Sequence, residues 1–461
     1  MHHIERIDFM EYNIAPDYVS SMEWREYCKK TELEYKQCMD EGLDIEQYKD
    51  LFFAVAKMPD GKEKDDISDI IFSIVAKSKV REGHKYNEPS DIDSIKALRD
   101  GFNVSGDLPD TETLKKKIEG AWIGRICGCL LGKAVECSRQ HELIPFLQET
   151  GNYPLHRYIL RSEVTDEMIA KYEYCFGNRD HIDQMDCAPI DDDTNYTVIA
   201  QLLIDKHGRS FTSKDVGEMW LTNQPVYKFY SAERVAFRNL INGYTAPASG
   251  MYKNPYREWI GAQIRGDYFG YINPGDPVSA ADMAWRDARI SHIKNGIYGE
   301  MWVSAMLACA AVTGDIVEII KGGLGQIPKT SRLYEEVTDV LTDYGNGVGF
   351  DTIIKKIHKD YDELTDHGWC HTISNAKIVT AAMLYYANDY GKAICMAVQS
   401  GFDTDCNAAT VGSVLGMANG IDSIDSYWYT PVNGRLRTSV LGCSEVTIAH
   451  LVEKTMEHIK Q

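Results

Sequence analysis

The sequence predicts an all-α protein with two parts. Along most of its 461 residues, apolar side chains recur at the three- and four-residue spacing of a helix, and turn-forming Gly, Pro and Asn separate these stretches. We find no convincing series of strand-like alternating segments and no repeat of fixed period. Residues 1–105 are expected to form a helical N-terminal extension of unknown role, and residues 106–461 the main domain.

Several short helices are expected in the N-terminal extension. Ser20 and Glu23 fit a capping box that opens a helix reaching about Glu41. Further helices are expected over about 44–57 and about 65–79, the second with its isoleucines on one stripe. These segments carry no pattern that indicates chemistry, so we interpret them as packing elements.

Glycines recur every fourth residue in GAWIGRICGCLLGKAVE, at the start of the main domain. They are Gly120, Gly124, Gly128 and Gly132. This spacing places them on one face of a helix, where each destabilises the helix by about 0.5–1 kcal/mol relative to Ala. The stripe therefore predicts the close approach of a second helix or of a ligand. Glu136 follows one turn later and is expected to face the same cleft as the aspartate clusters at residues 191–193 and 403–405.

Two acidic clusters each precede a predicted helix. Asp191, Asp192 and Asp193 are adjacent, and Asp403 and Asp405 lie two residues apart in GFDTDCNAA. An Asp at a helix start can be a simple N-cap. Adjacent carboxylates repel one another unless a cation or a basic group neutralises them, and Asp-x-Asp offers oxygen ligands to a hard divalent ion. We predict that the clusters meet across a cleft and share metal.

A further candidate surface lies between the two acidic clusters in the sequence. Residues 242–277 are rich in Gly, Pro, Tyr and Asn, and a loop of this length in a compact domain favours an ordered substrate-binding surface over a linker. The following stretch, SHIKNGIYGE, places His292, Tyr298, Gly299 and Glu300 at an expected break between two helices.

Composition limits the possible partners and the compartment. A net charge of −20 argues against a nucleic-acid surface, which needs clustered Lys and Arg. The most apolar segment, residues 301–313, is too short to span a bilayer, so no membrane partner is expected. The twelve cysteines are scattered without a CxxC pair, and no signal peptide is visible. We therefore expect a cytoplasmic protein.

Three sequence blocks resemble a known family. GAWIGRICGCLLGKAVE, IDDDTNYT and GFDTDCNAATVGSVLG are similar, in this order, to the signature blocks of the ADP-ribosylglycohydrolase family, and SHIKNG and IPKTSRL support the match. The resemblance spans about residues 117–445. It implies an orthogonal bundle of helices with two Mg²⁺ or Mn²⁺ ions. It also implies hydrolysis of the ribosyl glycosidic bond of an ADP-ribosylated protein or small molecule.

The resemblance also implies roles for individual residues. The implied metal ligands are Asp191, Asp192, Asp193, Asp403, Asp405 and Cys406. The implied catalytic residues are Glu136, Asp192 and Asp405, and the implied substrate-binding residues are His292, Tyr298, Gly299 and Asn407. Simpler interpretations stay open: Glu136 could be a surface residue past its helix, His292 could pack at a helix end, and Asn407 could cap its helix.

This chain departs from the family pattern at three site positions. Asp191 replaces a Thr, Cys406 replaces a Thr or Ser, and Cys129 replaces an Asp within the glycine-rich helix. An added carboxylate and a lost hydroxyl could shift the metal toward Mn²⁺ or Ca²⁺ or leave one position empty. Two alternatives to the implied activity follow. One is hydrolysis of another furanoside or a nucleoside on the same fold, and the other is a non-catalytic scaffold that binds metal or ADP-ribose.

Overall fold

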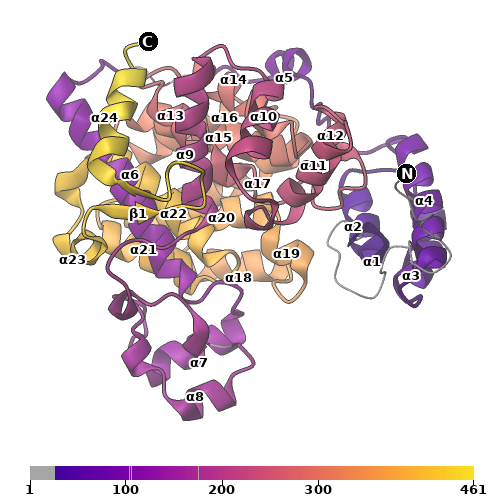
Figure 1. Cartoon of the computed structure of the whole chain (residues 1–461), viewed down its shortest axis with the longest axis horizontal. Helices are drawn as coiled ribbons and strands as arrows, with labels where there is room; N and C mark the ends of the chain where they lie inside the picture. The colour runs from indigo at the N-terminus through magenta and orange to yellow at the C-terminus, as the bar shows by residue number, and fades with distance from the viewer. Residues whose placement is uncertain (1–25, 103, 105, 175) are drawn as a thin grey trace, which may run out of the picture. The chain divides into compact units, whose positions relative to one another are not determined.

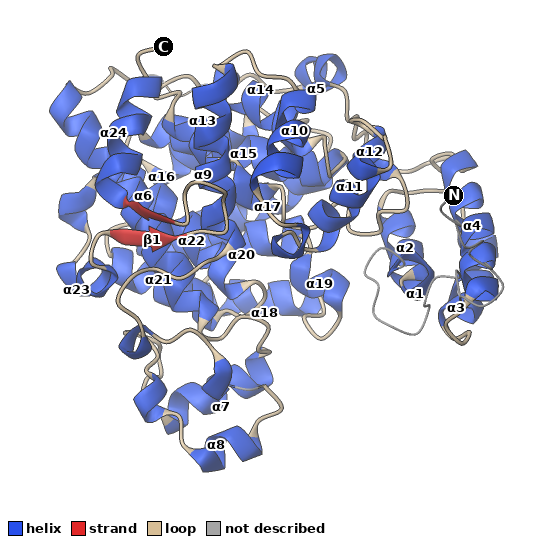
Figure 2. Cartoon of the chain, in the orientation of Figure 1, coloured by secondary structure: helices blue, strands red, loops and turns tan. Residues whose placement is uncertain are grey.

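The computed structural model describes residues 26–102, 104, 106–174 and 176–461. Over these residues the chain forms 24 α-helices and one two-stranded sheet (Figure 1), and Figure 2 shows how small the sheet is beside the helices. The all-α prediction is therefore confirmed. The chain divides into two compact units: residues up to His84 with Lys253–Pro255, and Lys85–Tyr252 with Tyr256–Gln461.

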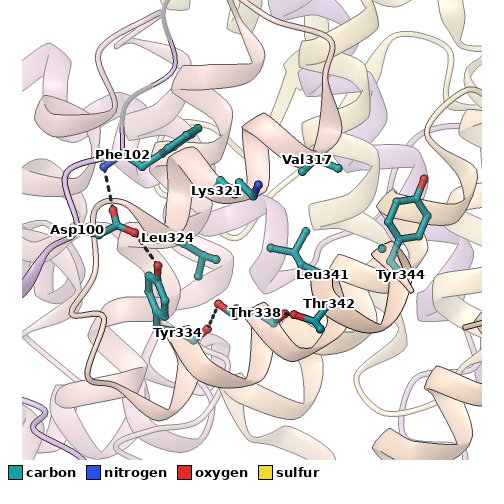
Figure 3. Close-up of a pocket in the computed structure, with 11 residues that line it drawn as sticks. Asp100, Phe102, Val317, Lys321, Leu324, Tyr334, Thr338, Leu341, Thr342 and Tyr344 are labelled. Carbon is teal, nitrogen blue, oxygen red and sulfur yellow. Dashed lines mark hydrogen bonds between the residues drawn. The ribbon is translucent and has the colours of Figure 1, made fainter. Parts of the chain in front are cut away.

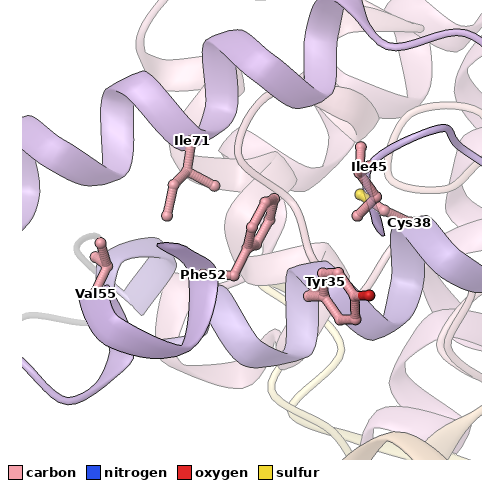
Figure 4. Packing of buried hydrophobic residues seen from close by; sticks show 6 residues of the cluster. All are labelled: Tyr35, Cys38, Ile45, Phe52, Val55 and Ile71. Atoms are coloured by element: carbon pink, nitrogen blue, oxygen red, sulfur yellow. The ribbon is translucent and has the colours of Figure 1, made fainter. Parts of the chain in front are cut away.

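The smaller unit packs four helices around its own apolar core. They are α1 (Glu26–Lys29), α2 (Thr31–Asp40), α3 (Lys49–Ala56) and α4 (Lys62–Lys77). Buried side chains from three of these helices and the intervening turn meet in the core (Figure 4); they are Tyr35, Cys38, Ile45, Phe52, Val55 and Ile71. The two helices expected over 44–57 and 65–79 correspond to α3 and α4. The capping box at Ser20 lies outside the described residues.

The larger unit contains the remaining helices and the sheet. The helices of its first half are α5 (Ile92–Leu98), α6 (Thr111–Lys133), α7 (Gln140–Glu149), α8 (Asp166–Lys171), α9 (Asp192–His207), α10 (Ser213–Asn223), α11 (Ser231–Ile241), α12 (Ala248–Met251), α13 (Asp267–Tyr271) and α14 (Pro277–Ala288). Those of its second half are α15 (Lys294–Ala310), α16 (Ile316–Leu324), α17 (Arg332–Gly345), α18 (Phe350–Asp360), α19 (Asp366–Cys370), α20 (Thr372–Tyr386), α21 (Tyr390–Gln399), α22 (Thr404–Asn419), α23 (Ser426–Tyr429) and α24 (Ile448–His458). Strands β1 (Arg435–Arg437) and β2 (Glu445–Thr447) pair antiparallel.

Helices α6 and α22 lie side by side through the middle of this unit (Figure 1). A Cβ atom added at Gly124 would lie 2.1 Å from the carbonyl oxygen of Gly412, and one at Gly128 would lie 2.1 Å from that of Ala408. Only glycine allows two helix backbones to approach this closely. The glycine stripe therefore marks the approach of a second helix, as predicted.

The break expected over residues 292–300 is shorter than predicted and ends before Lys294. Helix α14 ends at Ala288 and α15 begins at Lys294, so His292 lies in the connection while Tyr298 and Gly299 lie inside α15. Gly299 does not end the helix because it serves packing: an added Cβ there would lie 2.4 Å from Thr372 Oγ1. Tight packing against a neighbour outweighs the low helix propensity of glycine at this position.

The glycine- and tyrosine-rich stretch 242–277 is ordered rather than a linker. It contains α12, α13 and a 3₁₀ turn at Gln263–Arg265, and its side chains from Tyr256 to Ile272 are buried. No helix of the part of the chain that the structure describes is both long and apolar enough to cross a bilayer.

Candidate metal centre

The two predicted acidic clusters meet at one cavity of about 440 Å³ in the larger unit. The starts of α9 and α22, the end of α6 and residues 259–264 contribute to its wall. Among the predicted residues, those that line it are Glu136, Asp191, Asp192, Asp403, Asp405 and Cys406. In total, six carboxyl and three basic side chains line the cavity, which leaves an excess of negative charge.

Asp191 is fixed by two partners before α9. One carboxylate oxygen accepts a hydrogen bond of 2.9 Å from the backbone N–H of Asp193, so Asp191 does cap this helix. The other oxygen lies 2.6 Å from the Nζ atom of Lys133, at the end of α6. The basic side chain thus neutralises the carboxylate that stands where the family has Thr.

Asp193 is fully buried, and only one of its two carboxylate oxygens has a hydrogen-bond partner in the described chain. The Arg125 guanidinium of α6 donates to Asp193 Oδ1 at 2.9 Å and also lies 3.0 Å from Asp267 Oδ2. Asp193 Oδ2 has no hydrogen-bond partner among the described residues. Burial raises the pKa of Asp193 to about 8, although Arg125 opposes the shift. A cation beside Oδ2 would favour the ionised form.

The second cluster is not explained by helix capping. Asp403 stands at the N-cap position of α22, yet its side chain makes no capping hydrogen bond and lies 3.6 Å from the Cys370 thiol. Asp405 is buried in the first turn, and its Oδ1 atom lacks a hydrogen-bond partner within the described chain. Burial raises the pKa of Asp405 well above its usual value, and the charges of Glu136 and Asp403 raise it further.

Two sets of side chains at and beside the cavity have the spacing of a metal site. In each set, ligand atoms from every member lie within 4.8 Å of one another. The first set is Cys129, Asp191, Asp193 and Asp405, and the second is Asp403, Asp405 and Cys406. Ligands bound at about 2.0–2.3 Å lie at most about 4.6 Å apart across an ion, so the observed spacing fits one ion in each set. Asp405 belongs to both sets.

Cys129 is a member that the sequence analysis missed. The family resemblance implies only the loss of an Asp at this position, whereas the Cys129 thiol lies among three carboxylates. A signal for it exists in the sequence, because Cys129 lies four residues after Arg125 and four before Lys133 and therefore shares their face of α6.

Glu136 and Asp192 line the cavity without belonging to either set. Glu136 is half-buried, and burial together with the charge of Asp191 raises its pKa to about 7, with Lys133 opposing the rise. Asp192 is also half-buried; burial first, and then the charges of Asp191 and Asp193, raise its pKa. Both are available to groups that enter the cavity.

Aromatic and basic side chains complete the wall. Tyr230, Trp259 and Trp369 offer flat apolar surfaces, and Arg179 and Lys228 offer positive charge. This mixture of rings, cations and carboxylates is typical of sites for polar small molecules. Sequence reasoning missed both tryptophans, because Trp259 lies in an irregular segment and Trp369 in the five-residue helix α19. Neither segment has a periodicity that would indicate which way its side chains face.

The predicted substrate-binding residues lie elsewhere in the structure. His292, Tyr298, Gly299 and Asn407 are not among the described residues that line this cavity. The Tyr298 hydroxyl donates to the carbonyl oxygen of Pro89, and Asn407 Nδ2 donates to Asn375 Oδ1 at 2.8 Å. His292 Nδ1 lies 2.8 Å from the Ser291 hydroxyl.

A second cavity, of about 590 Å³, lies between α16, α17 and the segment around Phe102 (Figure 3). Its carboxylate, Asp100, accepts hydrogen bonds from the Tyr334 hydroxyl at 2.6 Å and from the Phe102 N–H at 2.8 Å. Both oxygens of the Asp100 carboxylate therefore have hydrogen-bond partners, unlike Asp405 Oδ1 at the first cavity.

Fold and site together define an all-helical protein with a carboxylate-rich centre whose side chains have the spacing of a metal site. The family model described as ADP-ribosylglycohydrolase matches residues 110–458. The chain therefore belongs to the ADP-ribosylglycohydrolase family, a family of glycohydrolases.

Two further comparisons complete this result. A solved structure described as an "ADP-ribosylglycohydrolase-related protein complex" is similar, with a TM-score of 0.46 and 16% identity over 76% of this chain and 99% of that chain. A search of curated proteins found no match.

Proposed function

We propose that this chain is a divalent-metal-dependent glycohydrolase that cleaves the ribosyl glycosidic bond of an ADP-ribosylated protein or small molecule. The observation that carries the proposal is a pair of buried carboxylate oxygens that have no hydrogen-bond partner in the described chain. They are Asp405 Oδ1, whose side chain lines the cavity, and Asp193 Oδ2, whose side chain belongs to the same ligand set as Asp405. Desolvated carboxylate oxygens without a partner are unfavourable unless a cation or a proton satisfies them.

The proposed ligands are the two aspartate clusters. Asp191, Asp193 and Asp405 would hold one ion, and Asp403, Asp405 and Cys406 another, with Asp192 at the rim. Mg²⁺ or Mn²⁺ is what the family resemblance implies, and Ca²⁺ stays an alternative. When bound, a divalent ion supplies Lewis acidity and lowers the pKa of water.

Glu136 is the proposed general acid or base of the chain. Glycosidic bond cleavage needs a group that can donate a proton to the leaving group or accept one from water. A pKa of about 7 suits both tasks near neutral pH. Once bound metal ions favour the ionised forms of Asp192 and Asp405, their negative charge would stabilise the positive charge that develops on the ribose.

The remaining wall residues support an ADP-ribosyl substrate. Arg179 and Lys228 could bind a diphosphate through ionic hydrogen bonds, and the rings of Trp259, Trp369 and Tyr230 could stack on a base. His292, Tyr298, Gly299 and Asn407 would then support the site from behind its wall. The nine cysteines that the structure describes in the larger unit are free thiols, which supports the expected reducing cytoplasm.

The test is release of ADP-ribose from ADP-ribosylated arginine, ADP-ribosylated serine and small-molecule conjugates. Each substrate is incubated with Mg²⁺, with Mn²⁺ or with a chelator, using the wild-type chain and the Asp192→Asn and Glu136→Gln variants. Asp422→Asn, at an exposed carboxylate of the same unit, is the matched control. We expect metal-dependent release by wild type and control, and at least tenfold slower release by both site variants.

Two results would replace the proposal. Release of a different sugar from a panel of nucleosides and furanosides, without release of ADP-ribose, would favour the other hydrolase. Tight binding of ADP-ribose without turnover under any metal would favour the non-catalytic scaffold.

A further inference from the structure

We infer that Cys129 and Cys406 each supply a sulfur ligand, so that the centre selects a thiophilic divalent ion such as Zn²⁺, Co²⁺ or Fe²⁺ over Mg²⁺ and Ca²⁺. This inference rests on the proposed metal centre and names the kind of ion that it takes. It also assigns a ligand role to Cys129, whose position in the family pattern is a carboxylate.

The geometry around Cys129 carries the first half of the argument. Its Sγ atom and one carboxylate oxygen each of Asp191, Asp193 and Asp405 lie within 4.8 Å of one another, and all four side chains are buried. Asp193 Oδ2 and Asp405 Oδ1 have no hydrogen-bond partner in the described chain. Lys133 offsets the charge of Asp191 and Arg125 that of Asp193, but no cation of the described chain is ion-paired with Asp405, so the repulsion among three carboxylates close to a buried thiol is only partly offset.

Cys406 occupies the matching position in the other set. Its Sγ atom lies within 4.8 Å of ligand atoms from Asp403 and Asp405, and all three residues are buried. Each set therefore contains one sulfur atom and at least two carboxylates. Asp405 is common to both, as expected for a carboxylate that bridges two neighbouring ions.

Donor chemistry then decides the type of ion. Mg²⁺ and Ca²⁺ prefer oxygen ligands throughout, whereas thiolate favours Zn²⁺ and other late divalent metals. Binding replaces the S–H bond of each cysteine with a sulfur–metal bond, releases the proton to solvent and leaves the oxidation state of the metal unchanged. The sulfur atoms thus shift the preference away from the Mg²⁺ that the family resemblance implies.

Cys127 provides a matched comparison on the same helix. It lies two residues before Cys129 and is equally buried, with 1% of its surface exposed against 3%. It belongs to neither set of clustered ligands in the described residues. Replacing either cysteine with alanine removes one buried thiol from α6, but only the change at Cys129 removes a member of a ligand set.

The experiment is titration of the chelator-treated full-length chain with Co²⁺, followed by absorption spectroscopy, with no substrate present. Thiolate bound to Co²⁺ gives a near-ultraviolet charge-transfer band that carboxylate ligands do not give. We expect the band in wild type and in Cys127→Ala, a loss of about half its intensity in Cys129→Ala and in Cys406→Ala, and its absence in the double variant. Competition calorimetry should show Zn²⁺ binding at least tenfold tighter than Mg²⁺ in wild type.

A further variant keeps the test decisive if an alanine variant fails to fold. Cys129→Asp retains a ligand of the family type and should bind Mn²⁺ with a weaker Co²⁺ band and a reduced preference for Zn²⁺. The inference is overturned if Co²⁺ binds to wild type without the band, or if the band is unchanged in both alanine variants. Either result leaves the proposed hydrolase intact, since that proposal is judged by metal-dependent release of ADP-ribose.

Discussion

Replacing Gly124 with alanine should destabilise the larger unit although the same change usually stabilises a helix. In a helix interior, Gly→Ala normally gains about 0.5–1 kcal/mol. Here the added Cβ would lie 2.1 Å from Gly412 O, so the two atoms must move apart by about 1.4 Å to reach an ordinary contact distance of about 3.5 Å. The nearest atoms, the carbonyl oxygen and carbon of Gly412, belong to the backbone and cannot rotate away as a side chain can. Overpacking of about 1–3 kcal/mol outweighs the gain, and we expect a net loss of about 1–2 kcal/mol.

The assay is urea denaturation followed by tryptophan fluorescence. Seven of the eight tryptophans lie in residues 85–461, so the signal reports mainly on the larger unit. Gly345→Ala is the matched control, because Gly345 ends α17 and an added Cβ would meet no described atom within 4 Å. The control should be unchanged or stabilised by up to about 1 kcal/mol. If Gly124→Ala were as stable as the control, the conclusion that the backbones of α6 and α22 touch at Gly124 would be refuted.

Three further predictions concern buried charge. Arg125→Ala leaves the Asp193 carboxylate without its cation and should lower the free energy of unfolding by about 3–5 kcal/mol, measured by the same denaturation. Asp405→Asn should weaken Mn²⁺ binding at least tenfold by calorimetry because it alters both ligand sets, and unchanged affinity would show that Asp405 is not shared. Glu233 has a pKa raised to about 7, mainly by burial and despite its ion pair with Arg265. The unfolded chain releases this proton near pH 4.3 and the folded chain near 7, so the wild type loses stability across that interval. Relative to wild type, Glu233→Gln should therefore be more stable by about 3 kcal/mol at pH 8 than at pH 4, and a constant difference would contradict the assigned pKa.

The fold and the meeting of the clusters could be predicted because each depends on a local and periodic signal. The four-residue spacing of Gly120, Gly124, Gly128 and Gly132 fixes one helix face, and only a close neighbour explains glycine there. Adjacent carboxylates repel wherever they lie, so their need for a cation is visible without the fold.

The substrate wall could not be predicted in the same way. Helix α15 is buried on all sides, so its sequence has no polar face to show whether Tyr298 points toward a cavity or into the core. Trp259 and Trp369 line the cavity from irregular or very short segments, where no period relates sequence to direction. When a family pattern is transferred residue by residue, a replaced residue counts as a lost one. Cys129 replaces an Asp of the pattern, yet it still lies among the carboxylates of the first ligand set.

Helix α6 carries both a helix-packing surface and residues of the candidate metal centre. Gly120, Gly124, Gly128 and Gly132 form one stripe with a four-residue period, and it faces α22. The residue after each of the last three glycines forms a second stripe on the adjacent face. Its members are Arg125, Cys129 and Lys133, which reach Asp193, the first ligand set and Asp191, respectively. Because successive residues differ by about 100° around a helix, the two stripes point to different neighbours. The glycines bring α22 close enough to present Asp405 to the second stripe, since an added Cβ at Gly132 would lie 2.4 Å from the backbone of Asp405. Separation of α6 from α22 should therefore disturb the ligand spacing as well as the core, which couples the stability of this pair of helices to metal affinity.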